Sequence, residues 1–134
     1  MKRTVMPKRK PRAPDQGSAT PELVLATPLL ILLLMAFFQF ALAAHAHHIA
    51  QAAAAQAVAA ARTQDGDAAT GRRAGEDLLA HVNSASLRDP SVSVSRSAGV
   101  ARADVYGHVV RLLPGLDLVV RAHSSGPIEQ LADG

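Results

Sequence analysis

Residues 23–44 read LVLATPLLILLLMAFFQFALAA, and this run decides the fold because it carries no charged residue over 22 positions. An α-helix rises about 1.5 Å per residue, so the run would extend roughly 33 Å. The hydrocarbon core of a bilayer is about 30 Å thick. A chain of 134 residues has too little additional structure to cover such a helix on every side. The run therefore predicts a membrane-spanning helix.

A cleaved secretory signal is the alternative interpretation of this run. The sequence ALAAHA at residues 41–46 places small residues where a signal peptidase could cut. However, the apolar region of a signal peptide has about 7 to 15 residues, and this run is longer. The length favours a retained membrane anchor.

The charges flanking the run predict its orientation. Six lysines and arginines precede it, and all three lysines of the chain fall within the first ten residues. The first basic residues after the run are Arg62, Arg72 and Arg73, with acidic residues between and just beyond them. The positive-inside rule places the N-terminus in the cytoplasm and the C-terminal body outside, in a single-pass protein of the cell membrane with lipid as a partner. Residues 1–22 carry a net charge of +4 and residues 23–134 a net charge of −1, so the basic charge lies in the N-terminal segment and we expect no nucleic-acid partner.

The helix is expected to continue beyond the membrane. After residue 44 the chain is rich in alanine, the best helix former, and has no glycine or proline until Gly66. A helix from near Pro21, where proline suits the first turn, to about Arg62 would have about 41 residues and extend roughly 60 Å. Small residues recur along it at four-residue spacing, for example at Ala46, Ala50 and Ala54. They indicate either close packing against copies or partners, or only the helix propensity of alanine.

Three histidines follow the apolar run, and they raise the question of a metal site. His45 and His48 share a helix face with His47 beside them, but no carboxylate or thiol is close in sequence. A metal site needs more converging ligands and a second shell. We expect a polar cluster at the membrane interface, with no metal and no cofactor. The chain has no cysteine, so it has neither disulfides nor thiolate ligands.

The remaining residues predict a small extracytoplasmic α+β domain over 72–134, joined to the long helix by a turn-rich linker at 63–71. Helical spacing of apolar residues predicts an amphipathic helix over 72–85. Alternating patterns at 91–95, 101–109 and 116–122 predict three strands, and Pro114 with Gly115 fits a tight turn before the third. The expected architecture is an antiparallel meander covered by one helix.

This predicted domain has a thin core and no recognisable catalytic motif. About 70 residues with one tyrosine and no phenylalanine should depend for stability on the long helix or on neighbours. We find no nucleophile motif and no phosphate-binding glycine loop in the sequence, so we do not expect an enzyme.

The junction between leader and apolar run, DQGSATPELVLATP at residues 15–28, carries a resemblance to a known family. Gly17 ends the basic leader, small residues follow, Glu22 precedes the apolar run and Pro28 interrupts it. This order resembles a type IV prepilin processing site, and more closely the TadE-like proteins, pilin-like components of tight-adherence (Flp-type) pilus systems. The resemblance covers residues 15–62, including the closing AAAR.

The resemblance implies a non-enzymatic pseudopilin with a cytoplasmic leader at 1–17 and a transmembrane and extended helix at 18–62. It implies cleavage between Gly17 and Ser18 by a prepilin peptidase, and a Glu22 that neutralises the new amine of a neighbouring subunit. The implied partners are other pilin-like subunits and pilus assembly proteins, in a pilus or secretion apparatus. Pro28 and Gln39 join the alanines as expected helix-packing positions.

Two residues depart from the family's pattern, and a second function stays open. Pro21 replaces the more usual apolar residue before the glutamate, and Gln39 lies about where the family often has a second acid. The alternative function is an uncleaved signal-anchored, or secreted, small binding module.

Overall fold

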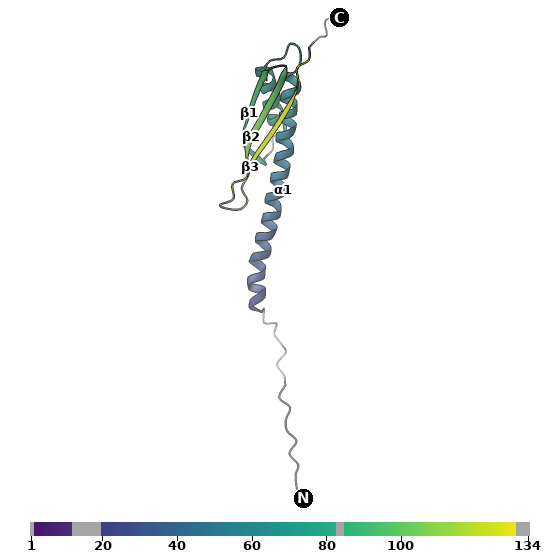
Figure 1. Ribbon diagram of the computed structural model, residues 1–134. Helices are drawn as coiled ribbons and strands as arrows, with labels where there is room; N and C mark the ends of the chain where they lie inside the picture. The colour runs from purple at the N-terminus through teal and green to yellow at the C-terminus, as the bar shows by residue number, and fades with distance from the viewer. Residues whose placement is uncertain (1, 12–19, 83–84, 131–134) are drawn as a thin grey trace. The chain divides into compact units, whose positions relative to one another are not determined.

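The computed structural model describes residues 2–11, 20–82 and 85–130, and it contains two helices and three strands (Figure 1). In chain order these are α1 (Pro21–Ala61), α2 (Ala68–Val82), β1 (Leu87–Ser97), β2 (Val100–Val109) and β3 (Val119–Pro127). The predicted α+β fold with a long apolar N-terminal helix is confirmed. Its residues fall into two compact units, 1–32 and 33–134, and α1 contributes to both.

In the first unit, the element that the structure describes is the start of α1. Pro21 is its first residue, as the sequence predicts, and the amide of Leu23 donates to the carbonyl of Thr20 at 2.7 Å. The proline needs no partner at this position, because the first amides of a helix lack intrahelical acceptors.

In the second unit, the three strands form an antiparallel sheet in the order β1-β2-β3. β1 and β2 are joined by a tight hairpin in which Ala98 and Gly99 have positive φ values of 49° and 76°, as a two-residue type I′ turn requires. Val105 at the centre of β2 pairs with Val92 on β1 and with Ala122 on β3. The predicted meander is therefore confirmed, although β1 is longer than expected and β3 begins three residues later than the predicted 116.

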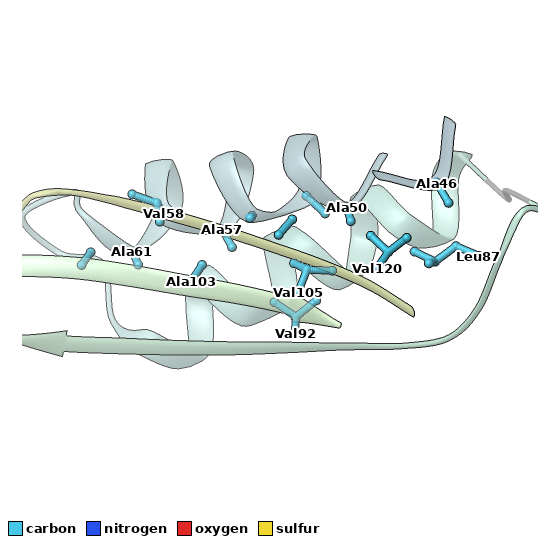
Figure 2. Packing of buried hydrophobic residues seen from close by; sticks show 14 of the residues in the cluster. Ala46, Ala50, Ala57, Val58, Ala61, Leu87, Val92, Ala103, Val105 and Val120 are labelled. Atoms are coloured by element: carbon cyan, nitrogen blue, oxygen red, sulfur yellow. The ribbon is translucent and has the colours of Figure 1, made fainter. Parts of the chain in front are cut away.

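The core lies on one face of this sheet. Alternate residues of β2 are buried, and they meet buried alanines of α1 and valines of the neighbouring strands (Figure 2). The buried apolar residues of α1 run from Ala46 to Ala61. The one helix predicted within the domain is α2, and the carboxyl-terminal part of α1 packs on the sheet together with it. A domain with such small side chains gains additional buried apolar area by sharing the long helix.

Helix α2 begins at Ala68, four residues before the predicted start, and ends at Val82. Asp67 caps it, since its Oδ1 accepts a hydrogen bond from the amide of Thr70 at 2.6 Å. The most buried residues of α2 are Gly71 and Gly75, whereas Val82 at its end is exposed. The connection from α1 is therefore shorter than the linker predicted at 63–71.

The cap makes the stability of α2 depend on pH. Hydrogen bonds from Thr70 lower the pKa of Asp67 from its ordinary value of 3.8. A lowered folded-state pKa means that the cap's contribution is fully present above pH 3.8 and is lost as the pH falls through the folded-state value. We expect Asp67→Ala to lower the thermal midpoint at neutral pH, and the difference from the unchanged chain to close in acid.

Asp67→Asn is the matched control, because asparagine caps a helix as well as aspartate and does not titrate. Its midpoint, measured by circular dichroism, should stay above that of Asp67→Ala at every pH. If both variants matched the unchanged chain at neutral pH, Asp67 would have no role as a cap.

Candidate functional site

The apolar section of α1 has no protein neighbours on most of its surface. Only 6% of its most apolar window is buried, and by length and composition it is the one helix among the described residues that could span a membrane. The exposed large side chains on this section are Leu23, Val24, Leu25, Leu29, Leu30, Ile31, Leu32, Leu33, Leu34, Phe37, Phe38 and Phe40. An apolar surface of this extent on a helix needs lipid or other apolar helices around it.

The residues expected at the processing site are described only in part. Gly17 and Ser18 lie outside the described residues. Glu22 is exposed in the first turn of α1, where a negative charge is favoured by the helix dipole. Within the described residues 2–11, 20–82 and 85–130, Glu22 forms no ion pair. Its carboxylate is thus free to meet a cation from outside this part of the chain.

Pro28 lies inside α1 and is exposed. Proline has no amide hydrogen, so the carbonyl four residues earlier loses its helical donor. Thr27, just before the proline, donates through its Oγ1 to the carbonyl of Leu23 at 2.9 Å, one residue before the freed carbonyl of Val24.

Gln39 marks the point at which α1 changes from an exposed to a buried helix. Its side chain is fully buried although it lies within the apolar run. Its Nε2 donates to the carbonyl of Val110 at 3.0 Å, and its Oε1 accepts from the amide of Leu112 at 2.7 Å. Both polar groups of the amide are satisfied by the chain just after β2, so Gln39 fixes this segment against the helix.

The alanines at four-residue spacing on α1, which we call the alanine stripe, pack within the chain. Ala46, Ala50 and Ala54 are fully buried in the core formed with the sheet. Farther along α1, Ala53, Ala57 and Ala61 are also fully buried. In this fold these alanines contact the chain's own sheet and α2, so their surfaces are not available to a second copy.

Two glycines of α2 complete this packing. A Cβ atom added at Gly71 would lie 2.7 Å from the carbonyl oxygen of Ala57 and 2.7 Å from Cβ of Ala61. At Gly75 it would lie 3.2 Å from the carbonyl oxygen of Ala53. The sequence analysis missed these residues, although the spacing Gly71-x-x-x-Gly75 was a signal for close helix contact.

The histidine cluster shows no metal geometry. His45, His47 and His48 are all exposed on α1. Among the described residues, no group of three histidine, aspartate or glutamate side chains is placed to hold a metal ion. His47 instead lines an open groove of about 620 Å³ beside β3, together with Phe40, Ala43 and residues 118–121.

These features define a class of protein. A long apolar N-terminal helix whose second part packs with another helix on a three-stranded antiparallel sheet is an α+β, pilin-like layout. Residues 17–59 match the family model described as TadE-like protein, which confirms the resemblance predicted from the sequence. Comparison with curated proteins and with solved structures gave no match. The family suggests a pilin-like protein associated with a tight-adherence pilus, and it is a family of structural pilus components.

Proposed function

We propose that this chain is a non-enzymatic, single-pass pseudopilin that contributes to the assembly or structure of a tight-adherence-type pilus or secretion apparatus. The observation that carries the proposal is the change in burial along α1. From Leu23 to Phe38 its large side chains are apolar and, except for the half-buried Met35, exposed, and from Gln39 onward one face is buried by the chain's own α+β domain. The first section can therefore enter a bilayer or a bundle of helices while the second holds the domain.

The charge of the leader supports a cytoplasmic N-terminus and an extracytoplasmic domain. In this proposal residues 1–17 are a leader, removed by a prepilin peptidase, and residues 23–44 contain the membrane span. Lipid surrounds the helix before assembly, and the helices of other pilin-like subunits surround it afterwards.

Glu22 has a defined role in the proposal. Cleavage after Gly17 would give Ser18 a free amine, a cation created at the membrane edge. A carboxylate in surroundings of low dielectric constant is costly unless it is paired. The exposed Glu22 could pair with the Ser18 amine of a neighbouring subunit, so that docking of two subunits would satisfy both charges.

The processing step is tested by the mass of the mature chain in cells that contain the pilus system. We expect the chain to begin at Ser18, and Gly17→Leu to leave the precursor uncut because the peptidase site would not accept a bulky side chain. Ser18→Ala is the matched control, since it keeps a small residue and should still be cut.

Three results would count against processing at Gly17: a chain that begins at Met1, a chain that begins after Ala44, or an unchanged mass for Gly17→Leu. An uncut chain retained in the membrane would favour the signal-anchored binding module. A start after Ala44 would favour a secreted module.

A further inference from the structure

The connection between β2 and β3 is unusually apolar for a surface loop. Residues 110–118 read VRLLPGLDL, and we call them the leucine loop. Leu112 is 38% exposed, and the loop's other leucines are half-buried. At its tip Gly115 has a φ of 83°, and a Cβ atom added there would meet nothing within 4 Å. The tip therefore projects from the domain with leucines on both sides of the turn.

Several backbone amides of the leucine loop are bonded inside the chain. Leu112 donates to Gln39 Oε1, and Leu116 donates to the carbonyl of Leu113 at 3.4 Å. At the base of the loop, Val109 donates to Leu118 and Val110 donates to Ser86, at 2.8 and 3.0 Å. Backbone groups that are satisfied within the protein are a condition for irregular chain to lie in apolar surroundings.

The loop is held at a defined level of α1. Gln39 binds it on both sides of Arg111, and the neighbouring helix residues Phe37, Phe38 and Phe40 are exposed. Figure 1 shows the loop leaving the end of the sheet below the label β3. A spanning helix needs about 20 residues. Counted from Leu23, such a span would end within about one turn of Gln39, which is the level of α1 to which the loop is bonded.

We propose that the leucine loop inserts into the interfacial region of the outer leaflet of the cell membrane. There it forms a second contact with lipid, in addition to that of the spanning helix. This inference rests on the proposed membrane anchoring. The loop's two charged side chains, Arg111 and Asp117, are opposite in sign. Insertion is therefore driven by apolar burial and requires no anionic lipid. Before the subunit is assembled, this contact holds the α+β domain at a fixed height and orientation relative to the membrane surface.

The test uses the full-length chain, whose lack of cysteine allows single labels. Spin labels are attached at Leu112→Cys, Leu33→Cys and Ser97→Cys in phosphatidylcholine nanodiscs with one copy per disc. Leu33 reports on the helix, and Ser97 lies at the hairpin, at the opposite end of β2 from the loop. The readout is the accessibility of each label to oxygen, which concentrates in lipid, relative to a water-soluble nickel chelate.

We expect the oxygen-to-nickel ratio at residue 112 to be several-fold higher than at residue 97 and close to that at residue 33. Leu116→Cys, in the same loop, should repeat the result of Leu112→Cys. A high oxygen-to-nickel ratio at residue 33 with a low ratio at residues 112 and 116 would overturn the proposed lipid contact of the loop but not the membrane anchoring of the helix. A low ratio at residue 33 as well would overturn the anchoring itself, and with it this inference.

Discussion

Gly71→Val is expected to destabilise the α+β domain by about 3 kcal/mol, because overpacking a close helix contact forces backbone and side chains apart. The first added carbon would already lie 2.7 Å from the carbonyl oxygen of Ala57 and 3.1 Å from Cγ1 of Val94. One of these contacts is to backbone, which cannot rotate away. The added side chain must therefore push α2 away from α1, from β1 or from both.

This loss is large relative to the stability of a small domain, which is about 5 to 15 kcal/mol. In purified full-length protein we expect the thermal midpoint to fall by roughly 10 °C or more. Tyr106 on β2 is the chain's only tyrosine, and there is no tryptophan, so its fluorescence reports on the sheet.

Ala80→Val is the matched control, since Ala80 is exposed on the same helix and the change also introduces a β-branched residue. We expect it to cost about 0.5 kcal/mol or less through helix propensity alone. Equal losses in the two variants would show that the contact between α2 and α1 is not tight at Gly71.

Helix α1 and the sheet could be predicted from local sequence because their signals are local. No residue between Pro28 and Ala61 breaks the helix, and alternation from Ala101 to Val109 marks the buried face of β2. The turn at Pro114 and Gly115 needs only its own residues, and the bond from Leu116 to Leu113 confirms it.

Helix α2 shows where local signals were insufficient. Residues 63–71 have the composition of a linker, and glycine is a poor helix former. Gly71 is helical because a residue without a side chain allows α2 to approach α1 closely. That gain depends on a contact with Ala57 and Ala61, so the start of α2 could not be predicted from propensity alone.

The alanine stripe was ambiguous for a related reason. Alanine favours a helix whichever surface packs against it, so its spacing indicated a packing face but not the partner. The structure places Ala46, Ala50 and Ala54 against the chain's own sheet. The hydrogen-bond partners of Gln39 could not be predicted from its local sequence either, because they lie 71 and 73 residues away in the chain.

Gln39→Leu is expected to cost about 3 kcal/mol, because it leaves the carbonyl of Val110 and the amide of Leu112 without their partners. A buried backbone group that loses its hydrogen bond costs about 1 to 3 kcal/mol, and here two groups are affected. Leucine nearly matches glutamine in size and suits the apolar run, so the loss reflects hydrogen bonding more than a cavity.

The matched control is Gln51→Leu, on the same helix. Gln51 also bonds the chain beyond β2, since its Nε2 donates to the carbonyl of His123 at 3.1 Å, but it is exposed and makes one such bond. Water can replace that bond, so we expect a change within about 0.5 kcal/mol. The two variants make the same chemical change and differ in burial and in the number of bonds.

Hydrogen exchange separates a local effect from general unfolding. In Gln39→Leu the amide of Leu112 and its neighbours in the leucine loop should exchange faster than in the unchanged chain, while the amides of β2 that bond to β1 should lose less protection. The loop is held to α1 through Gln39, whereas the sheet is held by its own ladder. Unchanged protection at Leu112 would mean that other contacts hold the loop against α1, and the proposed position of the loop at the membrane boundary would then not depend on Gln39.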